Sequence, residues 1–337
     1  RFSNSLNLSF TLLLFLSSLT MFMSGLVANF EFDLKKIIAL STLSQLGLMM
    51  SVLALGESML AFFHLLMHAL FKALLFMCAG CMIHNLNNCQ DIRWMGSLIN
   101  FLPLTSCFFS ICNMALCGLP FLSGFYSKDL ILEFMSMSYM NFYIYFIFYL
   151  STGLTVMYTV RLLYYTMIGD FNGVSYFNIE DSSVYLLKGM GGLIFTVIFG
   201  GSLLSWLIFP TPYFICLPLF MKLMVLFVVV SGALIGYAIS FMSFVDYSKM
   251  MNYYMFSSFM NSMWNLNYLS TFGVNYYFLM FGGKLFNYID QGWSEYYGSQ
   301  NMFYSIKMST YFLHRFFYNN IKFFLTLLLI WICLLLL

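Results

Sequence analysis

The chain alternates between long apolar runs and short polar connectors, and this pattern predicts a bundle of membrane-spanning helices. A helix needs about 20 apolar residues to cross a bilayer, and eight segments of the 337-residue chain have or approach that length. Charged residues gather in connectors such as 31–36 and 84–93. The predicted spans are residues 8–28, 37–55, 59–83, 103–138, 142–168, 186–209, 214–241 and 321–337.

The fourth of these segments contains a break. Pro120 and Gly124 interrupt the apolar run 103–138, and proline both lacks a backbone donor and clashes with the preceding turn. Irregular backbone at membrane depth is tolerated only where protein or water satisfies its polar groups. We therefore expect one discontinuous helix over residues 103–138, broken near 120–127.

Residues 265–317 differ in character from the spans before them. This stretch is rich in tyrosine and phenylalanine, but charged residues from Lys284 to Arg315 punctuate it. Such spacing does not suit a lipid-facing span and favours an interfacial segment. Glycines at 282, 283, 292 and 298 weaken the expectation of one unbroken helix.

Composition narrows the class of protein. Hydrophobic residues make up 62% of the chain and charged residues 8%, with a formal net charge of +2, whereas soluble domains carry roughly 25% charged residues. A soluble enzyme, a disordered protein and a nucleic-acid-binding protein are excluded. Cys78 and Cys81 have CxxC spacing without a second ligand pair, which favours small buried side chains over a metal or redox site.

Three titratable residues fall on one stripe of the third span. His64, His68 and Lys72 repeat every four residues, so they drift only about 80° around a helix while climbing roughly 12 Å. A lysine at the bilayer centre costs about 2.5–3.5 kcal/mol and should face a hydrated interior. The alternative is a pair of core histidines with a structural lysine. Three such groups on one face favour proton transfer.

Other polar positions leave their alternatives open. Lys128 follows the break, and Asp129 and Glu133 lie within about a turn and a half of it. Broken helices hold ion and proton sites in transporters, but Lys128 could equally be an interfacial lysine paired with Asp129. Ser44, in a run of small polar residues, favours helix packing over lining a water path. Arg161, late in its span, is expected to reach toward the interface.

Three long motifs resemble one known family. Residues 33–47, the run containing the two histidines and Lys72, and residues 119–129 are similar, in this order, to the NADH dehydrogenase subunit 5 family. Members are distal antiporter-like subunits of respiratory complex I, and the form resembles that of arthropod mitochondria. Residues 290–295 are also similar to the insect C-terminal region. The resemblance covers essentially the whole chain.

The resemblance implies a fold and a set of site residues. The family fold has two inverted five-helix repeats followed by C-terminal helices. In that pattern Lys72 is the central lysine with His64 and His68 beside it, and Lys128 is the lysine of the second repeat's broken helix, facing the exit path. Asp129, Glu133 and Ser44 are supporting residues.

The chain starts with Arg1, and the resemblance implies that the family's first eight helices lie before this residue. The expected fold class is an all-α polytopic membrane protein holding the second inverted repeat, with a lateral interfacial helix and a C-terminal anchor helix. The expected domains are the second antiporter-like repeat with about five spans (1–168), further spans and loops (169–264), the lateral helix (265–320) and a transmembrane helix (321–337).

The resemblance also implies a function. The expected protein is a proton-translocating subunit of NADH:ubiquinone reductase in the mitochondrial inner membrane, with no redox chemistry of its own. NADH, FMN, Fe–S clusters and ubiquinone would bind elsewhere in the complex. Its partners would be neighbouring antiporter-like subunits and the lipid bilayer, with no nucleic acid. A stand-alone cation/proton antiporter is the alternative, and a scaffold whose charges only specify packing is a third hypothesis.

Overall fold

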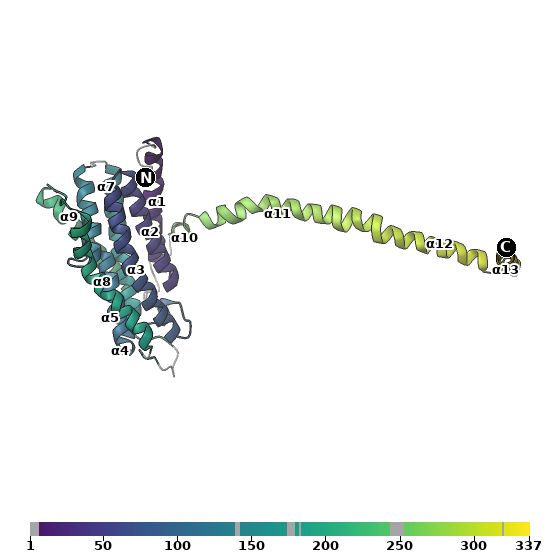
Figure 1. Cartoon of the computed structure of the whole chain (residues 1–337), viewed down its shortest axis with the longest axis horizontal. Coiled ribbons are helices and arrows are strands. Elements are labelled where there is room, and N and C mark those ends of the chain that lie inside the picture. Colours follow the sequence, from purple (N-terminus) through teal and green to yellow (C-terminus); the bar gives the residue numbers. More distant parts are fainter. Residues whose placement is uncertain (1–6, 139–141, 174–178, 182, 243–252, 319) are drawn as a thin grey trace. The chain divides into compact units, whose positions relative to one another are not determined.

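The chain forms two units, Arg1–Trp264 and Asn265–Leu337, which are described separately. The computed structural model describes residues 7–138, 142–173, 179–181, 183–242, 253–318 and 320–337. Every regular element among these residues is helical. Figure 1 shows the first unit as a set of helices packed side by side. Its main elements are α1 (Asn7–Phe30), α2 (Leu34–Ala54), α3 (Ser58–Asn85), α4 (Leu98–Phe101), α5 (Pro103–Cys117), α6 (Leu130–Ser138), α7 (Phe142–Leu163), α8 (Val184–Ile208), α9 (Leu219–Met242) and α10 (Tyr254–Asn261).

Six helices of the described residues are long and apolar enough to cross a membrane, which confirms the predicted all-α membrane class. They correspond to the predicted spans on α1, α2, α3, α7, α8 and α9. The span predicted from residue 214 is wrong at its start, because α9 begins at Leu219. Pro218 precedes this helix. Proline has no backbone N–H to donate to the carbonyl four residues earlier, so the helix does not extend back to residue 214.

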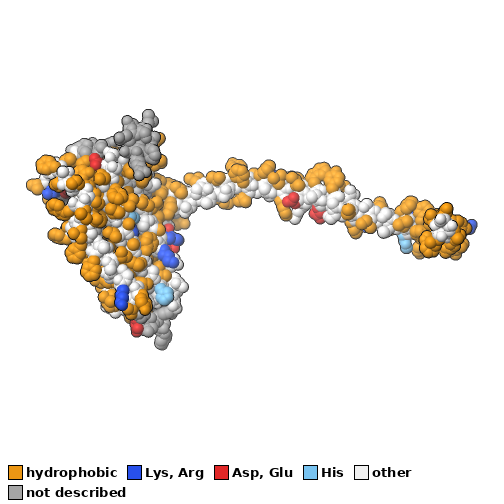
Figure 2. Space-filling view, in the orientation of Figure 1, with side chains coloured by type: hydrophobic (Ala, Val, Ile, Leu, Met, Phe, Trp, Pro, Cys, Tyr) orange, Lys and Arg blue, Asp and Glu red, His pale blue; other side chains and the backbone are white. Residues whose placement is uncertain are grey.

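Helix α3 forms the centre of the first unit. It contacts α2, α5 and α8, and Phe63, Met67 and Phe71 on its inner face are almost completely buried. Hydrophobic side chains also cover the outer face of the bundle, as Figure 2 shows. An apolar exterior suits lipid, so the interior is distinguished by its polar residues and its packing rather than by hydrophobicity.

Two connectors close one end of the bundle. An isolated antiparallel bridge joins Asp33 to Asp91, and the Leu34 amide donates to the Gln90 carbonyl at 2.9 Å. Lys36 forms an ion pair with Asp33 at 2.6 Å. The hydrogen bond from Lys36 lowers the pKa of the Asp33 carboxyl. The start of α2 is thereby tied to the loop that follows α3.

The chain breaks after α5, in the region where the sequence predicts a discontinuity. Helix α5 ends at Cys117, and Gly118 takes a left-handed conformation (φ 84°) that glycine adopts without strain. Residues 118–122 are not helical, and a wide π-helical turn, Phe125–Asp129, leads into α6. Helix α5 has only 15 residues, so it is shorter than the other spans.

Gly124 lets the returning chain press against the end of α5. A Cβ at this position would overlap the backbone carbonyl of Ala115. The overlap is with main chain rather than with a flexible side chain, so neither partner can move aside cheaply. The π-helical turn is therefore held directly beneath the end of the preceding helix.

The second unit is a long helix followed by a short one. It is helical from Tyr268 to Phe317 despite its glycines, with an angle of 103° to the final helix, α13 (Ile321–Leu336). Large aromatic and aliphatic side chains along it are exposed. Its elements are π-helical turns at Tyr268–Gly273, Phe286–Ser294 and Tyr296–Gln300, together with α11 (Val274–Leu285) and α12 (Asn301–Phe317).

The tight approach at the break gives a direct test of the fold. Gly124→Ala is expected to destabilise the bundle by about 1–3 kcal/mol, because the added methyl forces the backbone apart. The measurement is the thermal denaturation midpoint of the assembled membrane protein. Gly80→Ala is the matched control, since no atom lies within 4 Å of the added Cβ, and its midpoint should be unchanged or higher. Equal midpoints for the two variants would contradict this account of the break.

Candidate functional site

Polar side chains from four segments meet inside the first unit. His64, His68 and Lys72 lie along one buried stripe of α3, with exposed fractions of 1%, 8% and 4%. Helix α2, the π-helical turn Phe125–Asp129 and α7 supply the side chains around them. The stripe therefore faces the interior of the bundle rather than lipid.

His64 joins two segments by its two ring nitrogens. Its Nε2 lies 3.2 Å from Oε1 of Gln45 on α2, and its Nδ1 lies 3.0 Å from the Ser127 hydroxyl. An amide oxygen only accepts, so this arrangement fits the neutral ring with its proton on Nε2. Nδ1 then accepts from Ser127. His64 thus has one donor and one acceptor contact, as a group passing protons requires.

Lys72 and His68 occupy the next turns of the stripe. The Lys72 ammonium donates to the Ser41 hydroxyl on α2. The ring centroids of His68 and His64 are 6.3 Å apart. His68 Nε2 is buried with no hydrogen-bond partner among the described residues. A buried nitrogen of this kind costs about 1–3 kcal/mol when unpaired, a cost that a hydrogen-bonded water would remove.

Lys128 is buried by the π-helical turn, with an exposed fraction of 4%. Its ammonium donates to Thr155 on α7 at 2.9 Å and to the Leu116 carbonyl at 3.4 Å. Within the described part of the chain no ion pair joins it to Asp129. The alternative hypothesis, in which Lys128 is an interfacial lysine paired with Asp129, therefore does not agree with the structure.

The two acidic residues lie outward from Lys128. Asp129 is half-buried, and its Oδ1 is fully buried without a hydrogen-bond partner among the described residues. Glu133, one helical turn later on α6, is also half-buried and faces Lys222 of α9 across a pocket.

Ser44 lies beside the site, and among the described residues it forms no hydrogen bond with the lysines or histidines of the site. Its hydroxyl donates to the Ser41 carbonyl at 2.9 Å. The neighbouring residues Ser41 and Gln45 make the contacts to α3, although the sequence favours packing for this whole run. A buried tyrosine, Tyr158, places its hydroxyl near Ser41 and Ser44.

Sequence reasoning missed the partners of the site. Gln45, Ser127 and Thr155 were not among the predicted site residues. A signal for Thr155 exists, since Thr152, Thr155 and Thr159 recur at helical spacing on a largely apolar helix. No comparable local signal marks Ser127, whose inward direction follows from the π-helical turn.

The prediction for Arg161 is wrong. Its side chain is buried and donates to the Asn29 carbonyl. Its guanidinium also stacks on Phe32, at 4.8 Å from the ring centroid, and Arg93 lies over the same ring at 4.4 Å. The connector folds back over this end of α7, so the arginine meets protein rather than the membrane interface.

Comparison with known proteins gives the family. Residues 2–155 match the family described as NADH:quinone oxidoreductase/Mrp antiporter, TM, and residues 158–337 match NADH dehydrogenase subunit 5 C-terminus. The chain belongs to the NADH dehydrogenase subunit 5 family. Curated relatives in this family are named NADH-ubiquinone oxidoreductase chain 5. That of Anopheles gambiae is 53% identical over 324 residues, and that of Locusta migratoria is 52% identical over 319 residues.

The chain spans 56% of the length of each of these two subunit 5 relatives, while 96% and 95% of the chain is covered. Among solved structures it resembles one chain of the Mrp complex from Dietzia sp. DQ12-45-1b, with a TM-score of 0.58 and 23% identity. That match covers 73% of this chain and 29% of the other. The subunit 5 family member described here therefore shares its fold with part of an Mrp assembly.

The hydrogen bond that holds Lys128 can be tested alone. Thr155→Val removes the oxygen and keeps the shape, so a buried ammonium loses its better acceptor. The expected cost is about 1–3 kcal/mol, measured as a lower thermal denaturation midpoint of the assembled protein. Thr155→Ser keeps the hydroxyl and should retain most of the stability. If valine and serine lower the midpoint equally, packing rather than the hydrogen bond accounts for the loss.

Proposed function

We propose that this chain is the proton-translocating part of a subunit of NADH:ubiquinone oxidoreductase in the mitochondrial inner membrane. The observation that carries the proposal is a set of buried titratable residues joined across helices. His64 contacts both Gln45 and Ser127, and Lys128 directly follows Ser127 in the sequence. The names of the curated relatives support the assignment to this enzyme. Redox chemistry would take place in other subunits of the complex.

Each residue of the site has a separate role in moving a proton. Lys72 holds one on its ammonium, with Ser41 as acceptor. His68 and His64 extend the stripe along α3 toward the π-helical turn, where Ser127 contacts His64. Lys128 is the next group able to hold a proton. Asp129 and Glu133 lead away from it, and Ser44 supports the backbone of Ser41.

The free energy needed to move a proton against the membrane potential is similar in size to a change in the proton affinity of a buried lysine. Moving one charge against 100 mV costs about 2.3 kcal/mol. A shift of two units in the pKa of a lysine changes its proton affinity by about 2.7 kcal/mol. Modest changes in the charge or hydration around one buried lysine are therefore sufficient to drive a proton across part of the membrane.

We assign the second unit to contacts with neighbouring membrane subunits. Its helix from Tyr268 to Phe317 exposes aromatic and aliphatic side chains along its length and also carries Lys284, Asp290, Glu295 and Lys307. Antiporter-like subunits of the same complex are the partners that its apolar surface would suit, with lipid covering the remainder.

A stand-alone cation/proton antiporter remains the alternative function, because the Mrp assembly shares the fold. The two differ in a simple observation. Purification with NADH-oxidising activity supports the oxidoreductase, and sodium-dependent proton exchange without that activity supports the antiporter.

The proposed role of Lys72 predicts a specific loss. Lys72→Ala in the full-length subunit, within the assembled complex, should lower proton pumping per NADH oxidised by roughly tenfold or more, because the stripe loses a proton-holding group. The measurement uses sealed vesicles with a pH-sensitive dye. Lys188→Ala is the control, since that lysine is exposed on α8. An unchanged proton-to-electron ratio in the Lys72 variant would contradict the proposed role of Lys72 in proton transfer.

The second unit yields a separate prediction. A full-length subunit ending at Trp264 should fail to remain associated with its neighbours, because the exposed apolar helix is gone. Native electrophoresis of mildly solubilised membranes measures this. A subunit ending at Asn320, which loses only α13, is the comparison and should retain most of the association. Full assembly of the subunit that ends at Trp264 would contradict the assignment of the second unit to contacts with neighbouring subunits.

A further inference from the structure

A long groove runs between α7 and α9 on the outer surface of the first unit. Its volume is about 410 Å3, and its lining extends from Tyr145 to Met157 on α7 and from Met224 to Ile235 on α9. At the helical rise per residue, these stretches are about 16–18 Å long. The rim residues Phe146 and Ile235 are exposed, so the groove opens toward the membrane rather than into the bundle.

Glycines explain why the two helices leave this space. A Cβ at Gly232 would overlap the backbone of Gly153, and one at Gly236 would overlap the backbone of Met157. The helices therefore touch through their main chains, and because both contacts advance by four residues, the helices run in the same direction. Gly153 and Gly232 place no side chain beside this line of contact, so the floor of the groove is backbone, flanked by larger side chains such as that of Val228.

The polar side chains of the groove gather at one end. Tyr145 and Tyr149 line the end nearest the start of α7, whereas Met157 and Ile235 line the other end. Among the described residues that line it, the remaining polar one is Ser231, and its hydroxyl donates to the carbonyl three residues earlier at 3.1 Å. Tyrosines are typical of the level at which headgroups meet hydrocarbon in a bilayer. The groove therefore has the polarity of a lipid, with a polar outer end and an apolar remainder.

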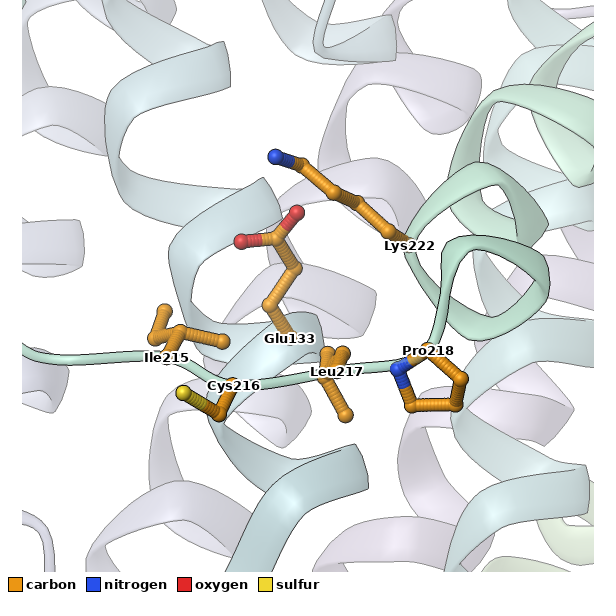
Figure 3. A pocket seen from close by; sticks show the side chains of 6 residues that line it. All are labelled: Glu133, Ile215, Cys216, Leu217, Pro218 and Lys222. Atoms are coloured by element: carbon orange, nitrogen blue, oxygen red, sulfur yellow. The ribbon is translucent and has the colours of Figure 1, made fainter.

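A charged pocket marks the membrane surface near that polar end. Figure 3 shows the Glu133 carboxylate of α6 and the Lys222 amine of α9 beside the connector 215–218. Lys222 is exposed, and lysines near the end of a span reach toward the interface. Met224 follows Lys222 by two residues, so the groove begins about 3 Å along the helix axis from this cation. A positive charge at that level suits the phosphodiester of a phospholipid.

The size of the groove matches one hydrocarbon chain. One leaflet supplies half of the hydrocarbon thickness of a bilayer, which is about 15 Å and close to the length of the groove. A volume of about 410 Å3 over about 17 Å corresponds to a mean cross-section of about 24 Å2. A transmembrane helix, with a diameter of about 10 Å, needs about 80 Å2. The groove therefore admits an extended acyl chain and is too narrow to admit a helix of another subunit.

We propose that this groove binds one acyl chain of a phospholipid, with the ester end of the chain at Tyr145 and its methyl end at Met157 and Ile235. The lipid belongs to the leaflet nearest the start of α9. A chain in the groove gains dispersion contacts with both helices that an empty groove lacks, so it holds α9 against α7. The site lies on the outer face and uses neither Lys72 nor Lys128, so it is independent of the proposed pumping function.

The first experiment locates the chain by photolabelling in the assembled complex. Membranes receive a phosphatidylcholine with a diazirine in its acyl chain, mild detergent removes bulk lipid during purification, and the complex is then illuminated. A diazirine beside the ester should label residues around Tyr145 and Met224, and one at the chain end should label residues around Met157 and Ile235. Mass spectrometry of the digested subunit locates the adducts. A reversed pattern, equal labelling of the exposed face of α8, or no lipid adduct on either stretch overturns the proposal.

The second experiment fills the groove. Ser231→Phe should lower this labelling by roughly fivefold or more, because the ring takes the space of the chain. Val230→Phe is the matched control, since it adds the same ring at the neighbouring exposed position outside the groove, and its labelling should be unchanged. Ser231→Leu, a smaller filler, should give an intermediate loss and decides the question if the phenylalanine variant fails to assemble. Labelling of both Ser231 variants equal to that of Val230→Phe contradicts the proposal.

Discussion

A charge inside an apolar bundle must be met by polar groups, and much of the first unit follows from this constraint. Each unsatisfied ammonium at membrane depth costs several kcal/mol. Lys72 is met by Ser41 of α2, Lys128 by Thr155 of α7, and Arg161 by the Asn29 carbonyl of α1. The three cations therefore bind separate helices together, and the packing of α1, α2 and α7 around α3 is coupled to where positive charge sits.

The interrupted helix is the means by which one of these charges enters the core. An uninterrupted α5 would carry its side chains onward at 100° per residue. The left-handed Gly118 and the close approach at Gly124 return the chain beneath Ala115, and the wide π-helical turn then directs both Ser127 and Lys128 inward. Here Ser127 contacts His64 while Lys128 reaches Thr155.

Local pattern was enough for the spans, for the region of the break and for the stripe on α3, because each depends on residues close in sequence. Apolar run length sets a span, and the four-residue repeat sets a helical face. Local pattern could not predict the contacts between helices. Gln45 and Thr155 are ordinary small polar residues until the packing brings them to His64 and Lys128. Arg161 was misplaced because its neighbour Phe32 comes from a connector that folds back over α7, which no local pattern records.

Arg161 differs from the buried lysines in one respect that bears on direction. A guanidinium does not lose its proton in proteins, so this end of α7 is permanently positive, whereas Lys72 and Lys128 can become neutral. Arg161 lies six residues beyond Thr155, which is about 9 Å along the helix axis. Tyr149, near Asp129 and Glu133, lies on the other side of Thr155. The positive charge of Lys128, held at Thr155, therefore lies between the Arg161 guanidinium toward one end of α7 and the carboxylates near Tyr149 toward the other, and the two ends of this helix act on that charge with opposite sign.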